Sequence, residues 1–148
     1  MIRRIEVLSC KCLRYISQDL APFQILVGPN ASGKSSFLDT LVFLPDLLNN
    51  GLERAVRKRV RTLKELTWKM GSDVFEIAIE IDLPRNSSTN GSLAEYSHMR
   101  YEIQVGLNDD SGLTLSVENL WFCREEARRE KQGQLQPELF SWRDRTAP

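Results

Sequence analysis

The stretch Gly28-Pro29-Asn30-Ala31-Ser32-Gly33-Lys34-Ser35 decides how the rest of this sequence is interpreted, because it matches G-x-x-x-x-G-K-S, the pattern of a phosphate-binding (Walker A) loop. Residues 23–27 before it form a short apolar run, which is typical of a buried strand. Residues 36–44 after it have the spacing of a helix, and its apolar face is Phe37, Leu41, Leu44 and Leu48. Strand, glycine loop and helix follow one another in the order that phosphate binding requires.

Each part of this loop has a chemical role. Small residues let the backbone turn its N–H groups toward a phosphate, and Gly28 and Gly33 permit turns that a β-carbon would block. A helix that begins near Gly33 adds unpaired N–H groups and the positive end of its dipole. Lys34 supplies a positive charge for the β- and γ-phosphates, and Ser35 supplies a hydroxyl for Mg²⁺. The alternative is an ordinary strand-to-helix turn that happens to contain glycine and lysine.

Composition sets broad limits on the protein. A chain of 148 residues fits one domain, and 41% hydrophobic with 27% charged residues is ordinary for a globular protein. The formal net charge is zero, so charge indicates no partner. We expect a cytoplasmic protein without a membrane partner, because no apolar run approaches the roughly 20 residues of a membrane helix and the N-terminus has no signal core. The cysteines at 10, 12 and 123 suggest buried or half-buried thiols rather than a zinc site.

Two helices and two extended segments are expected in the first half of the chain. Residues 2–8 predict a strand, and residues 10–20 predict a second extended segment with a turn at 17–19. Pro45 should end or kink the first helix. Residues 52–66 predict a second helix, with an apolar stripe of Leu52, Val56, Val60 and Leu63. Beside it runs a basic stripe of Arg54, Arg57, Lys58, Arg61 and Lys64. This stripe could follow a DNA backbone, although a solvated face is the simpler interpretation.

After Gly71, apolar residues recur at every second position. Residues 74–83, 99–107 and 113–122 predict antiparallel strands, because clean alternation is typical of a sheet with one wet face. The phase of the third strand slips after Glu118, which suggests a bulge there. Residues 108–112 predict a hairpin connection. Residues 84–97, which contain sequons at Asn86 and Asn90, predict a polar loop. Residues 124–131 form a charged run, and 139–142 could begin another strand.

Hydrolysis of a nucleotide needs more than this loop. It requires a second strand that ends in a carboxylate to hold Mg²⁺ and position water. The nearest candidate, residues 79–83, alternates polar and apolar residues, which places Glu80 and Asp82 on the solvent face of an antiparallel strand. Glu118 is a second candidate, for which a satisfied residue at a sheet edge is the simpler interpretation.

The N-terminal third of the chain resembles a known family. The early strand, the basic segment Lys11-Cys12-Leu13-Arg14 and the loop GPNASGKSS together resemble the RecF/SMC-like branch of the ABC-type ATPases, and especially the AAA-type ATPases grouped with bacterial defence proteins. Residues 1–50 carry the specific match, and 51–123 fit more loosely. The implied fold is an α/β P-loop NTPase, an ABC-ATPase-like first lobe with a central sheet plus an antiparallel β-subdomain. The resemblance divides the chain into 1–50 as nucleotide-binding core, 51–70 as a helical segment, 71–123 as antiparallel strands and 124–148 as a tail.

The same resemblance implies site residues and partners. ATP and Mg²⁺ are the implied cofactors, with Ser35 on the metal and Lys11 near the nucleotide. The loop residues that the family uses correspond here to Asn30, Ala31, Ser32, Gly33, Lys34, Ser35 and Ser36. The family's Walker B acidic pair, signature motif and switch histidine are not found, so we expect residues 1–148 to be the first lobe of a longer ATPase that works as a homodimer or with a partner chain. Two alternatives stay open: a non-catalytic, nucleotide-dependent regulatory module, and a small P-loop kinase or GTPase.

Overall fold

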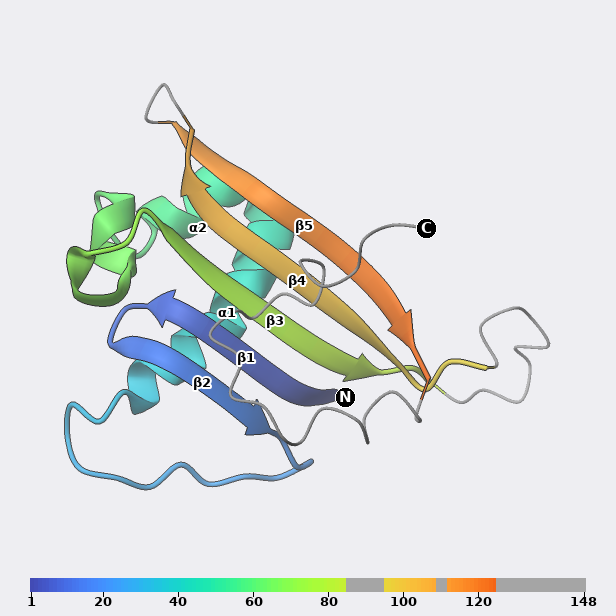
Figure 1. Cartoon of the computed structure of the whole chain (residues 1–148). Coiled ribbons are helices and arrows are strands. Elements are labelled where there is room, and N and C mark those ends of the chain that lie inside the picture. Colours follow the sequence, from blue (N-terminus) through green and yellow to red (C-terminus); the bar gives the residue numbers. More distant parts are fainter. Residues whose placement is uncertain (85–94, 109–111, 125–148) are drawn as a thin grey trace.

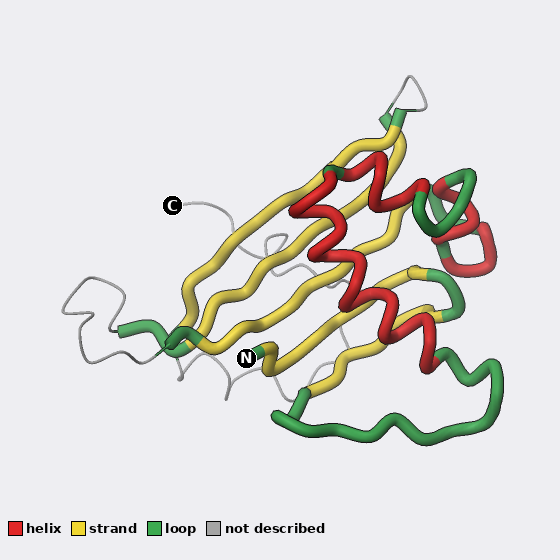
Figure 2. Tube along the Cα trace, turned by 180° about the vertical axis from the view of Figure 1, so that it is seen from behind, coloured by secondary structure: helices red, strands yellow, loops and turns green. Residues whose placement is uncertain are grey.

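The computed structural model describes residues 1–84, 95–108 and 112–124. Within these ranges a five-stranded antiparallel sheet is covered on one face by two α-helices (Figures 1 and 2). The order of the strands in the sheet is β2-β1-β3-β4-β5. The strands are β1 (Ile2–Cys10), β2 (Leu13–Asp19), β3 (Val74–Asp82), β4 (His98–Leu107) and β5 (Leu113–Cys123). The helices are α1 (Lys34–Asn50) and α2 (Leu52–Arg57), followed by two short 3₁₀ helices, η1 (Leu63–Leu66) and η2 (Trp68–Met70).

The apolar core lies between the sheet and α1. Alternation along the central strands places Ile5, Ile77 and Ile103 on the helix side, where each is at most 1% exposed. The helix contributes Phe37, Phe43, Leu44 and Leu47, all buried. The Phe43 and Phe75 rings meet edge to face with centroids 5.5 Å apart. Burial of these large side chains is the main favourable term that attaches α1 to the sheet.

The three strands expected after Gly71 are confirmed, and two details of the sheet differ from expectation. The first hairpin turns at Lys11 and Cys12 instead of 17–19, because residues 17–19 continue the ladder, with Asp19 opposite Arg4. The register shift in β5 falls opposite Gln104 and Val105, so Ser116 is the extra residue and the bulge precedes Glu118. Leu120 and Phe122, the apolar residues that follow the bulge, have side chains that are 52% and 43% exposed. They lie at the end of β5 that the helices do not reach (Figure 2).

Both helical predictions need correction. Pro45 lies inside α1, and the helix continues to Asn50 because the buried Phe43, Leu44 and Leu47 hold it against the sheet on both sides of the proline. Leu47, not Leu48, belongs to the buried face, and Leu48 is 66% exposed. The helix predicted over 52–66 stops at Arg57. Thr62 and Glu65 form a capping box that starts η1 as a separate turn.

The polar loop and tail predictions lie largely outside the described residues. Both sequons, the segment 125–148 and the expected strand at 139–142 belong to this group. At the hairpin connection, the amide of Asn108 donates to the carbonyl of Gly112 at 2.9 Å. No helix in the described ranges is both long enough and apolar enough to span a membrane.

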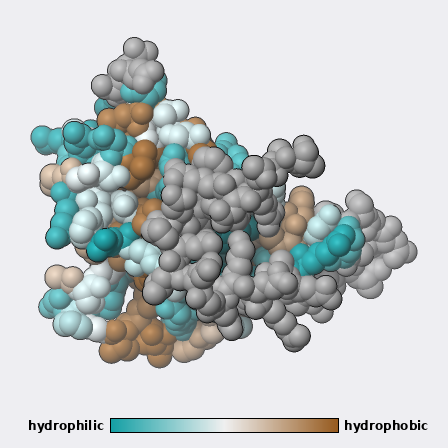
Figure 3. All heavy atoms as spheres, viewed as in Figure 1, coloured by the Kyte–Doolittle hydropathy of each residue, from teal (hydrophilic) through white to brown (hydrophobic). Residues whose placement is uncertain are grey.

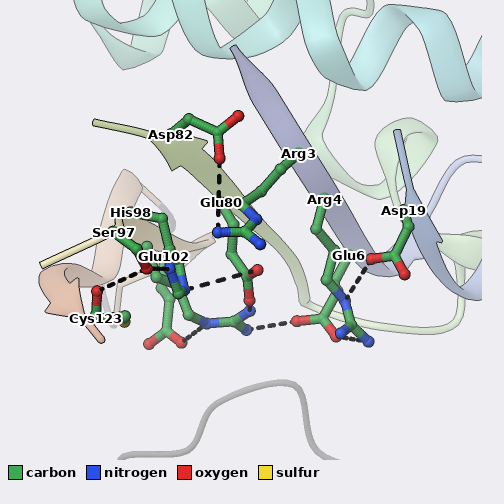
Figure 4. Close-up of polar contacts among 11 residues, drawn as sticks. Arg3, Arg4, Glu6, Asp19, Glu80, Asp82, Ser97, His98, Glu102 and Cys123 are labelled. Atoms are coloured by element: carbon green, nitrogen blue, oxygen red, sulfur yellow. Dashed lines mark hydrogen bonds and ion pairs between the residues drawn. The ribbon is translucent and has the colours of Figure 1, made fainter. Parts of the chain in front are cut away.

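The other face of the sheet carries a network of charges that includes Glu6, Glu80 and Glu102 (Figure 4), and Arg100 is at its centre. Its guanidinium pairs with Glu6 at 2.6 Å, Glu80 at 3.3 Å and Glu102 at 2.6 Å, so three strands contribute carboxylates to one cation. Glu102 is fully buried and also accepts a hydrogen bond from Trp121 Nε1 at 3.3 Å. Although burial lowers the pKa of Arg100, the Glu6 and Glu102 carboxylates outweigh it and raise that pKa above its ordinary value.

We predict that Arg100→Met lowers the free energy of unfolding by about 3–5 kcal/mol, because the substitution leaves buried carboxylates without their cation. Urea denaturation measured by circular dichroism tests this. The matched control is Arg57→Met, which breaks a 2.8 Å pair with Glu53 whose side chains are 69% and 67% exposed. An exposed pair is worth about 1 kcal/mol or less. Equal losses in the two variants would contradict the prediction.

Candidate functional site

The glycine loop leads directly into α1, as the sequence predicts. Gly33 caps the helix with φ of 94° and Ala31 has φ of 63°, so the chain makes two left-handed turns within the loop. The first helical hydrogen bond runs from the amide of Phe37 to the carbonyl of Gly33 at 2.8 Å. No side chain caps this end of the helix. The first amides of α1 therefore remain available to an anion, and the helix dipole favours one.

Lys34 folds back over the loop that precedes it. Its ammonium donates to the carbonyl of Gly28 at 2.8 Å, to that of Pro29 at 2.6 Å and to Ser32 Oγ at 3.3 Å. All three acceptors are neutral oxygens of the loop itself. A phosphate oxygen carries a full charge and makes a stronger hydrogen bond with an ammonium, so it can replace them. Ser35, the predicted Mg²⁺ ligand, is exposed beside this lysine.

The strand expected before the loop is not formed. Residues 20–29 are irregular, and the side chains of Phe23, Ile25 and Val27 are 81%, 69% and 89% exposed. Figure 3 shows hydrophobic atoms gathered at the lower edge of the molecule, where Figure 1 places this segment between β2 and α1. The physical reason is that a strand needs a neighbour for its backbone N–H and C=O groups, and no described strand pairs with residues 23–27.

The β1–β2 hairpin lies against the start of α1. Cys12 Sγ is 3.2 Å from Ser36 Oγ, and Leu13 is one of the nearest side chains to Gly33. Cys12 is exposed, contrary to the expectation for the thiols, whereas burial raises the pKa of the Cys10 thiol to about 12. Lys11, expected near the nucleotide, forms a 2.5 Å ion pair with Asp39 of α1. The structure thus brings Lys11, Cys12 and the loop residues to one end of the helix.

Asp39 and Arg59 also belong to this region, and sequence reasoning did not single them out. Arg59 pairs with Asp39 at 2.9 Å and with Asp46 at 2.8 Å. Hydrogen bonds from Lys58 and Arg59 hold the pKa of Asp46 below its ordinary value. The available signal was two aspartates seven residues apart, which share one face of a helix.

The three carboxylates considered for catalysis are placed elsewhere. Glu80 lies on the face of the sheet opposite the helices (Figure 4), as alternation predicts. Glu80 is held by Arg100 with a side chain only 12% exposed, and Asp82 is 3.5 Å from Arg3. Glu118 accepts a hydrogen bond from the Tyr101 hydroxyl at 2.7 Å. Each of these carboxylates therefore has a structural partner.

The basic stripe does not form one helical face, because α2 ends within it. Arg57 pairs with Glu53, Lys58 with Asp46, and Lys64 approaches Asp73 at 3.9 Å. These carboxylates offset much of the positive charge that a DNA backbone would meet.

The class of protein follows from a comparison of the chain with known protein families. The chain matches the family described as "AAA domain, putative AbiEii toxin, Type IV TA system" over residues 23–147, which includes the whole glycine loop and α1. No curated protein matches the sequence. The chain therefore belongs to this AAA family, which makes it a P-loop ATPase domain. Domains of this class generally bind ATP with Mg²⁺.

We predict that Gly33→Ala destabilises the protein by about 1–3 kcal/mol, because a side chain at this left-handed φ is strained. The added Cβ would also lie 3.2 Å from Leu13 Cδ2 and 3.3 Å from Cys12 Sγ. Thermal unfolding measures the loss. The control is Gly71→Ala, where φ is −102° and the nearest atoms are 3.8 Å and 3.9 Å away. A Gly33→Ala variant as stable as the control would contradict this description of the loop.

Proposed function

We propose that the loop from Asn30 to Ser36 binds the phosphates of Mg²⁺–ATP. The observation that carries the proposal is the uncapped N-terminus of α1, together with a Lys34 ammonium that is held on the carbonyls of Gly28 and Pro29 in the loop leading into it. The left-handed Gly33, whose Cβ position is crowded by Leu13 and Cys12, also fits a loop that requires glycine at this turn. Lys34 would contact the β- and γ-phosphates, and the Ser35 hydroxyl would hold the metal. Bound Mg²⁺ neutralises part of the phosphate charge.

The proposal extends to the kind of ATPase. The exposed apolar run at 23–27 supports a role as the first lobe of a RecF/SMC-like ATPase, since this segment has the composition of a strand and lacks a pairing strand among the described residues. A second sheet layer would pair its backbone and cover its side chains. In such an assembly, a partner chain would supply the carboxylate and signature groups for hydrolysis. The positions of Glu80, Asp82 and Glu118 support this division of roles, because each is held by another residue.

A non-catalytic regulatory module is the second candidate. The observation that favours it is the exposure of the loop itself, since Ser35 and residues 28–32 are all exposed. Electrostatic contacts to the phosphates are weaker in water than in a closed site. A module of this kind would bind ATP and change its contacts with a partner without turnover.

We predict that Lys34→Ala weakens Mg²⁺–ATP binding by roughly 10- to 150-fold, because it removes a charge-assisted contact of about 1.5–3 kcal/mol. Isothermal titration calorimetry measures both affinities. The control is Lys64→Ala, which removes an exposed lysine on η1 and should leave the affinity unchanged. Equal ATP affinity in folded Lys34→Ala and parent protein would refute the assignment of the loop.

We also predict that the purified chain alone releases phosphate from ATP no faster than its Lys34→Ala variant. The transition state requires metal held on two sides, an ordered water and further positive charge, of which this loop supplies only part. Steady-state phosphate release is the measurement. Robust release that disappears in the variant would mean that a carboxylate of this chain is catalytic, and Glu118→Gln, Asp82→Asn and Glu80→Gln would then identify it.

A further inference from the structure

Three separate segments meet at the carboxylate of Asp39, five residues after Lys34 on α1. One oxygen accepts from the Nζ of Lys11, at the tip of the β1–β2 hairpin, at 2.5 Å. The other accepts from the Nε of Arg59, beyond the end of α2, at 2.9 Å. The Asp39 side chain is 27% exposed, so both ion pairs are partly shielded from water. One carboxylate therefore joins the hairpin, the helix and the segment after α2.

Arg59 is a rigid partner for this carboxylate. Its side chain is only 6% exposed and makes three more contacts, to Asp46 at 2.8 Å, to the carbonyl of Ala55 at 2.9 Å and over the Phe43 ring at 5.2 Å. A guanidinium held in this way loses little additional freedom when it binds Asp39. Arg59 thus fixes the position of the Asp39 carboxylate from one side.

Lys11 connects the Asp39 carboxylate to the β1–β2 hairpin. Its backbone is left-handed with φ of 52°, and its amide donates to the carbonyl of Leu66 at 2.6 Å. The next two residues, Cys12 and Leu13, are those that contact Ser36 and lie against Gly33. Any movement of Lys11 would therefore reach the first turn of α1 through its direct neighbours.

We propose that Asp39 is a positioning residue for the phosphate loop. By bridging Lys11 and Arg59, it keeps the hairpin packed against the first turn of α1. The loop amides are thereby held in the arrangement that binds phosphate. This anchoring matters especially here because residues 23–27 do not form a strand that could hold the loop from its other end. Its effect on ATP rests on the proposed function, whereas the anchoring itself can be measured without nucleotide.

Asp46 provides a matched comparison within the same helix. It binds the same Arg59 and also Lys58, and its side chain is 13% exposed, but it lies two helical turns farther from the loop. If Asp39 contributed only to general stability, Asp39→Asn and Asp46→Asn would have the same effects. A positioning role predicts different effects at the loop.

Amide hydrogen exchange of the nucleotide-free chain is the first test. In Asp39→Asn we expect amides of residues 37–40 and 9–13 to exchange about tenfold faster, because local opening of this end becomes easier. In Asp46→Asn we expect changes only at 43–60. Lys11→Met, which leaves the Asp39–Arg59 pair intact, should also speed exchange at 9–13 and 37–40, and it decides the question if Asp39→Asn does not fold. Exchange at 37–40 that is unchanged, or that matches Asp46→Asn, overturns the proposal.

Calorimetry with Mg²⁺–ATP is the second test. We expect Asp39→Asn to weaken binding roughly 3- to 30-fold, and Lys11→Met to add much less in the Asp39→Asn background than alone. Asp46→Asn should bind within about twofold of the parent. If the parent shows no Lys34-dependent ATP binding, the proposed function fails and the exchange experiment still decides the role of Asp39. If binding depends on Lys34 but neither affinity nor exchange responds to Asp39→Asn, only this inference fails.

Discussion

The position of the phosphate loop depends on how α1 packs against the antiparallel sheet. Phe37, Phe43, Leu44 and Leu47 bury one side of the helix on strands β1, β3 and β4. The segment before the loop is irregular and exposed, so the loop is positioned from its helical end. The apolar seam sets where the helix lies, and the ion pairs of Asp39 and Arg59 fix the hairpin beside it. Apolar burial, which is non-directional, therefore positions the helix, whereas the directional ion pairs position the hairpin beside it.

The two faces of the sheet use charge differently. On the helix face, charged groups stay at the margin of the core and connect elements. On the opposite face, Arg100 gathers Glu6, Glu80 and Glu102 into one buried network across three strands. A network of this kind contributes little net stability compared with apolar packing, but removing its central cation is costly. It also explains why an acidic sequence in β3 does not provide a free carboxylate for catalysis.

The exposed run at 23–27 connects the architecture to the proposed activity. Monomeric proteins seldom leave Phe, Ile and Val side chains so exposed in one continuous segment. Such a segment is ready to pair with another strand, and the same event would place a second layer beside the phosphate loop.

Elements whose signals are local could be predicted from the amino-acid sequence. Two-residue alternation predicted β3, β4 and β5, and the spacing of glycines, Lys34 and Ser35 predicted the loop and the start of α1. Features that depend on contacts between segments distant in the sequence could not be predicted in this way. The apolar run at 23–27 is not a strand because strand formation needs a partner, and Pro45 does not end α1 because packing against the sheet offsets its missing hydrogen bond. The meeting of Lys11, Asp39 and Arg59 was likewise invisible in the sequence, because ion pairs between distant segments leave no local pattern.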